Sequence, residues 1–132
     1  MQWLKAAPNA NLHPPIALDV CNPWPQIGQD AIFTANTVHI MPWRAVTHLF
    51  LGAAETLPSR GLLCLYGPFI YTRKSLAASN KRFDKQLKQR DPTQGLRYVE
   101  ALDRLAKRSG LKLVADMTMP TNNQLLVWKK HC

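Results

Sequence analysis

The sequence feature that most limits the fold is an uninterrupted apolar run at residues 62–66 (LLCLY), which Gly67 and Pro68 end. A strand with one face in water alternates apolar and polar side chains, whereas a strand covered on both faces is apolar throughout. Residues 62–66 therefore predict a strand of a largely parallel sheet with helices on both faces. Because parallel strands need long, usually helical crossovers, the rest of the chain should alternate between strands and helices.

The segments before this run fit that alternation. Residues 16–20 (IALDV) and 31–36 (AIFTAN) are short apolar runs, and each predicts a strand. Residues 43–57 carry apolar side chains at helical spacing, and Pro42 suits the first turn of that helix.

The segments after the run predict two helices. The first starts near Ser79 or Asn80, two residue types that cap helices well, and ends at residues 91–92 (DP). The second has Gly110 where a left-handed cap belongs. Its apolar face runs from Leu96 to Ala106, and its opposite face carries Arg97, Glu100, Arg104 and Lys107.

The end of the chain predicts an antiparallel hairpin. Residues 111–119 alternate apolar and polar side chains, Asn122 and Asn123 suit a turn, and residues 124–128 form a last apolar run. We therefore expect one α/β domain over residues 1–132, with a partial Rossmann-like sheet that is mostly parallel and closes with this hairpin. Such an ending is typical of a class I methyltransferase domain.

The positive charge is local. The chain has a formal net charge of +9, but residues 1–72 sum to zero. Residues 73–112 hold twelve basic and four acidic side chains, which gives +8. A basic segment of this kind can attract nucleic acid or an acidic protein. A solvated helix surface is the simpler interpretation, because no aromatic RNA-binding motif accompanies the charge.

The cysteines and histidines point to neither disulfides nor a metal. The 3 cysteines are odd in number and far apart, so a reducing cytoplasm is the expected compartment. The 4 histidines do not fall at ligand spacing, and we expect no metal site. No apolar run approaches the roughly 20 residues that cross a bilayer, so no membrane association is expected.

Five blocks of the sequence are more specific than this pattern. They are residues 15–20 (PIALDV) with 23–25 (PWP), 34–43 (TANTVHIMPW), 65–69 (LYGPF), 79–84 (SNKRFD) with 90–92 (RDP), and 119–123 (MPTNN). In this order, and over almost the whole chain, they resemble the uncharacterised methyltransferase-like protein 26 family, also called domain of unknown function 938. The resemblance implies a fold that uses S-adenosylmethionine (SAM) and a methyl acceptor that is not identified.

The resemblance also implies a cofactor site. Asp19 falls where such folds place an acid that accepts the adenine amino group, and Val20 and Cys21 would line the adenine. Asn36 and Thr37 follow the next strand, at the carboxyl ends of the strands where open α/β sheets bind ligands.

The same resemblance implies residues for catalysis and for the acceptor. His39 and Asn36 would act in catalysis, with His39 as a general base. Tyr66, Asn80 and Asn122 match family positions that face the acceptor pocket.

Each of these residues has a simpler structural explanation. Asp19 could cap the loop amides of residues 21 and 22, and Asn36 could serve only as a turn residue. His39 could be a packed core histidine, and Tyr66 ordinary core. The spacing alone leaves these alternatives open.

The sequence departs from the family at its start. The family begins with a strand and a glycine-rich loop, then a second strand that ends in an acid. Here there is no Gly-x-Gly, and the first of the 6 glycines is Gly28. We expect the sheet to lack its first two strands. A micromolar affinity corresponds to about 8 kcal/mol of binding free energy, and losing half of that free energy leaves roughly millimolar binding. We therefore expect SAM to bind weakly or not at all. We also expect the isolated chain to be incomplete or inactive.

The expected departure also suggests partners. The absent first strand would pair with residues 31–36, whose edge should therefore pair with a second copy or with a complementing chain. The competing function is a non-catalytic module that contacts nucleic acid or an acidic protein through residues 73–112.

Overall fold

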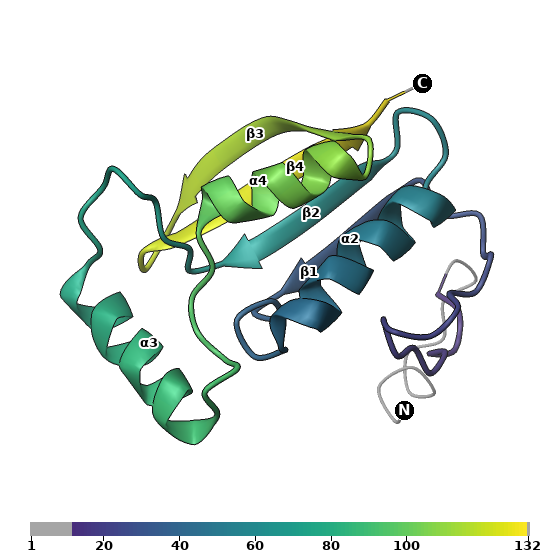
Figure 1. The fold of residues 1–132 in the computed structure, drawn as a ribbon. Helices are drawn as coiled ribbons and strands as arrows, with labels where there is room; N and C mark the ends of the chain where they lie inside the picture. Colours follow the sequence, from purple (N-terminus) through teal and green to yellow (C-terminus); the bar gives the residue numbers. More distant parts are fainter. Residues whose placement is uncertain (1–11, 132) are drawn as a thin grey trace.

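The computed structural model describes residues 12–131 (Figure 1). Its strands are β1 (Ala31–Ala35), β2 (Leu62–Gly67), β3 (Leu111–Met119) and β4 (Asn123–Lys130). Its helices are α2 (Trp43–Thr56), α3 (Ala78–Arg90) and α4 (Val99–Arg108). None of the helices in the described part combines the length and the hydropathy that a membrane span requires.

The four strands form one open sheet in the order β1-β2-β4-β3. β1 and β2 are parallel, and β4 is antiparallel to both β2 and β3. The expected α/β fold with a C-terminal antiparallel hairpin is therefore confirmed. Of its three strand pairings, β1–β2 is parallel and the other two are antiparallel.

The segment at residues 16–20 is not the strand that its composition predicted. It has no strand assignment, and Ile16 and Leu18 are exposed. A strand needs a partner for its backbone hydrogen bonds, and no strand of the described residues pairs with this segment. A short apolar run identifies a candidate strand but does not supply that partner.

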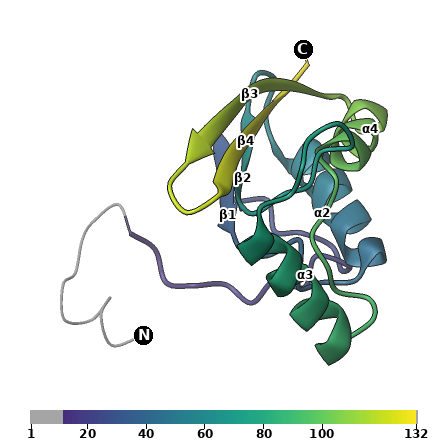
Figure 2. The ribbon, with the colours of Figure 1, turned by 90° about the vertical axis from the view of Figure 1, so that its left-hand side faces the viewer.

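One face of the sheet is covered by α2 and α4, which lie together on the same side in Figure 2. Phe50 of α2 packs edge-to-face on Trp128 of β4, with ring centroids 5.2 Å apart. Leu63, Leu65 and Leu102 are buried in the same core.

The expected cover on both faces is absent from the described part of the chain. Leu62, Cys64 and Tyr66 alternate with the buried residues of β2 and are half-buried. No helix of residues 12–131 lies over that side (Figure 2). The apolar run therefore has one face in the core and one apolar face without helical cover.

Local sequence signals explain most of the element ends. Pro42, with φ of −66°, stands just before α2, and its ring fixes that angle. α3 ends at Arg90, with Asp91 as its C-cap directly before Pro92. Gly110 has φ of 83° directly after the end of α4, as expected for a left-handed cap.

The predicted cap of α3 is wrong. The N-cap is Ala77, and no side chain caps it. Ser79 and Asn80 lie inside the first turn, and both bond to Asn122 in the turn between β3 and β4. Their polar side chains fasten α3 to the hairpin instead of to its own amides.

Candidate functional site

The carboxyl ends of β1 and β2 lie at one edge of the sheet, because the two strands are parallel. The turn between β3 and β4 lies at the same edge, since Gly67 pairs with Gln124 and Gln124 pairs with Thr118. α3 lies beyond this edge in Figure 1. Open α/β sheets bind their ligands outside the carboxyl ends of the strands, so this edge is the candidate site.

Asn36 and Thr37 form the turn that leaves β1. Asn36 has a left-handed φ of 55°, and its amide N–H donates to Tyr66 O at 2.8 Å. Its exposed side-chain amide makes no hydrogen bond within residues 12–131. Thr37 is held more firmly, because its hydroxyl lies 2.6 Å from that of Thr34. The turn explanation of Asn36 is thus correct for its backbone, while its side chain remains available to a ligand.

The loop that follows is held by the segment before α4. Arg97 Nε donates to Val38 O at 2.9 Å, and its Nη2 donates to Met41 O. Gly95 N donates to His39 O at 3.0 Å, and Gln94 Nε2 donates to Ile40 O at 3.2 Å. Four consecutive carbonyls, of residues 38 to 41, therefore accept hydrogen bonds from residues 94, 95 and 97.

Arg97 itself is placed differently from the prediction. It was expected on the exposed face of a helix, but it precedes α4 and is half-buried, with its guanidinium 5.7 Å from the Trp43 ring centroid. Burial lowers the pKa of Arg97, although its hydrogen bonds to backbone carbonyls all use the protonated group. Periodicity alone could not have found this role, since it depends on the path of the chain before the helix.

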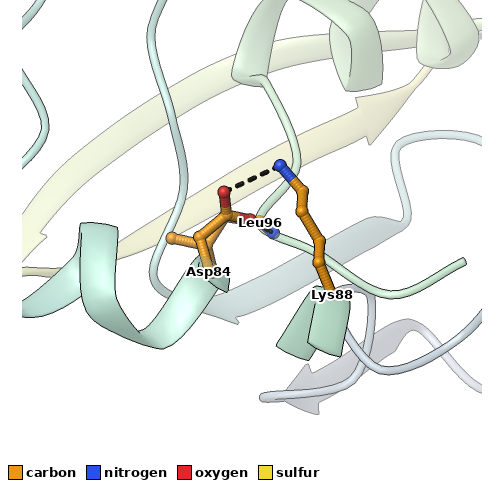
Figure 3. Close-up of polar contacts among 3 residues, drawn as sticks. All are labelled: Asp84, Lys88 and Leu96. Atoms are coloured by element: carbon orange, nitrogen blue, oxygen red, sulfur yellow. Dashed lines mark hydrogen bonds and ion pairs between the residues drawn. The ribbon is translucent and has the colours of Figure 1, made fainter. Parts of the chain in front are cut away.

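Asp84 fastens the same segment to α3 (Figure 3). Its Oδ1 accepts from Leu96 N at 2.8 Å, and its Oδ2 pairs with Lys88 Nζ at 2.8 Å. Hydrogen bonds thus connect the segment before α4 to the loop after β1 on one side and, through Asp84, to α3 on the other.

His39 is buried, with 3% of its surface exposed. Its ring packs edge-on against Phe83 of α3, with centroids 5.3 Å apart. Burial, and to a lesser extent the nearby Arg97, lowers the pKa of His39. The burial supports the explanation of His39 as a packed core histidine, although none of the hydrogen bonds of residues 12–131 joins its ring to a carbonyl. The lowered pKa favours the neutral imidazole.

A hollow of about 190 Å³ opens between the hairpin turn and the start of α3. Asn80 and Asn122, two of the predicted acceptor residues, both line it, and Asn80 Nδ2 donates to Asn122 O at 3.1 Å. The rest of the lining is Phe69, Tyr71, Lys74, Ser75, Leu76, Ala77, Thr118 and Gln124. We call this the carboxyl-end hollow.

The wall of this hollow contains a residue that the sequence prediction missed. Tyr71 donates its phenol proton to Asp116 Oδ2 at 2.5 Å, and Gln124 Nε2 donates to Asp116 Oδ1 at 2.8 Å. Burial, together with the Asp116 carboxylate, raises the pKa of Tyr71, so the phenol stays protonated. The available signal was the position of Tyr71, five residues beyond the end of the strand predicted at residues 62–66.

Tyr66, the third predicted acceptor residue, does not line the hollow. It is half-buried on the sheet face without helical cover, one residue before the end of β2. Its carbonyl, rather than its phenol, contacts the site, through the bond from Asn36 N.

Asp19, Val20 and Cys21 form a separate turn. Asp19 Oδ1 accepts from Cys21 N at 2.9 Å, as the capping explanation requires, and Asn22 N bonds to the Asp19 backbone carbonyl. Val20 O accepts from Trp24 Nε1 at 3.0 Å. No hydrogen bond among the residues that the structure describes joins this turn to Asn36 or Thr37.

Residues 12–131 hold no group of three or more His, Cys, Asp or Glu side chains placed to share a metal ion.

Solved structures share this fold. The LepI complex with SAM aligns with a TM-score of 0.79 and 14% identity over 98% of this chain and 33% of that chain. Human N-acetylserotonin methyltransferase in complex with SAM aligns at 0.72 and 14% over 88% and 33%. An O-methyltransferase family 2 protein from Planctomyces limnophilus, in complex with apigenin, aligns at 0.73 and 19% over 86% and 34%.

These matches establish a methyltransferase-like fold. The chain spans about a third of the length of the solved structures that it matches. The sequence also matches, over residues 1–130, the model of one protein family. The chain therefore belongs to the family described as "Protein of unknown function (DUF938)".

Proposed function

We propose that this chain takes part in SAM-dependent methyl transfer to a small-molecule acceptor, at the carboxyl ends of β1 and β2. The observation that carries the proposal is the arrangement of that edge. An exposed Asn36 amide and a hollow lined by Asn80 and Asn122 lie there, in a fold shared with SAM-bound structures. The five sequence blocks further support kinship with the methyltransferase-like protein 26 family.

The described residues fit one side of a SAM site. Asn36 offers an unoccupied amide on a left-handed turn, and Thr37 beside it is fixed by Thr34. Asp19 fits less well, because its carboxylate already accepts from Cys21 N. In this proposal Asn36 and Thr37 hold the cofactor, and Asp19, Val20 and Cys21 reach the adenine only as a separate contact.

The chain's main contribution would be positioning. SAM, when bound, supplies a methyl group already activated on its sulfonium, so holding the acceptor in line accounts for much of the rate. Asn80 and Asn122 would orient the acceptor in the carboxyl-end hollow, with Tyr66 supporting the strand end. This division needs no strong base.

His39 remains our candidate when the acceptor must lose a proton. Its lowered pKa keeps the imidazole neutral, which is the form that accepts a proton. The acceptor would have to approach it past Phe83, which packs against its ring. Asn36 would then bind the acceptor or cofactor beside it.

The exposed edge of β1 is the proposed contact for a partner. Among residues 12–131, β1 pairs with β2 alone, and Phe33 on it is 64% exposed. Exposed Leu18 and Ile27 line a hollow together with Phe33, and exposed Ile16 lines the next hollow with Ile27. Unpaired apolar edges favour strand pairing, so a second copy or a complementing chain would cover this edge.

Calorimetry with SAM tests the functional proposal. We expect weak binding, roughly millimolar, because Asn36 and Thr37 offer few polar contacts and the Asp19 carboxylate is already bonded to Cys21 N. Asn36→Gly should weaken the binding further, since glycine keeps the left-handed backbone and removes only the amide. Thr121→Gly, at another left-handed position, is the matched control. Low-micromolar binding would contradict the expected weak affinity, and equal effects of the two variants would contradict the proposed role of Asn36.

A further inference from the structure

Basic side chains lie together at the end of the sheet opposite the carboxyl ends of β1 and β2. β2 and β3 begin there and β4 ends there, since Leu62 pairs with Lys129 and Leu111 with Lys130. The chain end and the loop before β2 lie together at this edge in Figure 1. A hollow of about 190 Å³ is present, lined by Arg60, Lys112, Val114, Lys129, Lys130 and His131. We call it the basic hollow.

Paired backbone fixes the positions of these residues. Arg60 N donates to Lys130 O at 3.0 Å, and Lys130 N donates to Gly61 O at 2.9 Å. Arg60 has a left-handed φ of 69°. Lys112 and Lys129 are direct cross-strand partners on β3 and β4. Lys112 and Lys129 therefore project together from one face of the sheet, whereas Lys130, the neighbour of Lys129, turns its ammonium to the other face, toward Leu57 O.

Their charge is not neutralised by the described residues. The ion pairs of residues 12–131 are Lys88–Asp84 and Lys107–Asp103, and neither involves the basic hollow. Lys130 Nζ donates to Leu57 O at 2.7 Å, which leaves its charge uncompensated. Like charges placed directly opposite across two strands are unfavourable. An anion between Lys112 and Lys129 would remove that repulsion.

The residues that line the hollow indicate which class of anion it would bind. Val114 is 50% exposed and forms an apolar part of the wall, beside the irregularity between Leu113 and Ala115. An arginine fork and several ammonium groups match the oxygens of a phosphate. An apolar surface beside them suits the organic part of a phosphate ester.

We propose that Arg60, Lys112 and Lys129 form a binding site for the phosphate group of a phosphorylated ligand, with the backbone of Lys130 holding Arg60 in place. The site lies at the sheet edge opposite the proposed SAM site and does not depend on it. The phosphate can belong to a free ester or to a nucleic-acid backbone, and the two sources are separated by experiment. The basic residues of α3 differ from this set, because Lys81, Arg82 and Lys85 are spread along one exposed helix and line neither the basic hollow nor the carboxyl-end hollow.

The test uses pyrophosphate and a single-stranded oligonucleotide as probes for the full chain. Calorimetry should give a dissociation constant for pyrophosphate below about 1 mM. The Lys112→Gln/Lys129→Gln double variant should raise this constant at least about tenfold. Arg60→Gly should also raise it, since glycine accepts the left-handed backbone. The Lys81→Gln/Lys85→Gln variant removes the same charge from α3 and should leave the affinity unchanged.

Thermal unfolding separates loss of the site from loss of the fold. The Lys112→Gln/Lys129→Gln variant should melt at or above the wild-type temperature without ligand, because the opposed charges are gone, and pyrophosphate should no longer raise its Tm. Oligonucleotide binding that exceeds pyrophosphate binding and is lost in the same variant would support the site and identify a polymer as the source. Dissociation constants above about 1 mM for both probes, or equal losses in the two double variants, would overturn the proposal.

Discussion

At the scale of single residues, Arg97 joins two segments of the chain through hydrogen bonds to three backbone carbonyls. It donates to Val38 O and Met41 O in the loop after β1, and to Thr93 O at 2.9 Å in its own segment. The start of that loop carries Asn36, Thr37 and His39. Arg97 is thus a positioning residue for the candidate site.

Arg97→Met should lower the free energy of unfolding by about 2 kcal/mol, because partly buried carbonyls would lose their donor. Urea denaturation measures this change. Arg104→Met, on the exposed side of α4, is the control and should stay within about 0.5 kcal/mol of wild type. Equal stability of the two variants would mean that the Arg97 bonds do not hold the loop.

His39 predicts a pH dependence of stability. Its pKa is lowered below 6.5 in the folded protein, so the unfolded chain binds more protons at acid pH. Its contribution is complete above pH 6.5 and is lost as the pH falls toward the lowered folded-state pKa. The slope approaches about 1.4 kcal/mol per pH unit for one proton.

Urea denaturation between pH 7.5 and 5 checks this. The loss of stability should be shallower in His39→Gln than in wild type, while His13→Gln, at an exposed position, should retain the wild-type slope. A wild-type slope in His39→Gln would contradict the buried neutral imidazole.

At the scale of elements, Trp24 holds the segment after residue 20 against α2. A Cβ at Gly52 would collide with the Trp24 indole ring. Glycine inside a helix normally costs about 1 kcal/mol relative to alanine, so close approach of the ring explains it here.

The effect of Gly52→Ala on the free energy of unfolding should therefore have opposite signs in wild type and in a Trp24→Ala variant. In wild type it should destabilise the protein, because the ring is displaced. In a Trp24→Ala variant the same substitution should stabilise it by up to about 1 kcal/mol. A double-mutant cycle of unfolding free energies measures the reversal, and the same sign in both backgrounds would show that Trp24 does not pack there.

Element prediction succeeded where one local signal determines the outcome. Hydrophobic spacing identified β1, α2, β2, β3 and β4, and Pro42, Asp91 and Gly110 located helix ends. It failed where the answer depends on a distant partner: residues 16–20 find no strand to pair with, and Ser79 and Asn80 bind the hairpin turn. The family resemblance assigned Asn80 and Asn122 to the acceptor pocket but did not predict their hydrogen bond. That bond, the Arg97 bonds and the Tyr71–Asp116 pair depend on tertiary contacts that periodicity does not encode.

At the scale of the whole molecule, two surfaces of the described residues lack a partner. The edge of β1 has no neighbouring strand on one side, and one apolar face of the sheet has no helix packed on it. β1 (AIFTA) has neither lysine nor proline, the residues that commonly protect an edge strand. We expect the chain to associate through this edge at micromolar concentration.

Light scattering after size-exclusion chromatography measures that association. Phe33→Lys should shift the chain toward monomer, since it places a charge on the edge strand. Leu51→Lys replaces an exposed apolar residue on α2 and should leave the mass unchanged. A wild-type chain that stays monomeric at several hundred micromolar would contradict this expectation.

The most direct test of the proposed methyl-donor site is a residue-resolved NMR titration of the chain with S-adenosylhomocysteine, the demethylated form of SAM. The proposal predicts saturable shifts at the amides of residues 34–41 and 66–67, with roughly millimolar affinity, and a clear loss of affinity in Asn36→Gly. Absence of saturable shifts at those amides, or shifts that Asn36→Gly leaves unchanged, would contradict it.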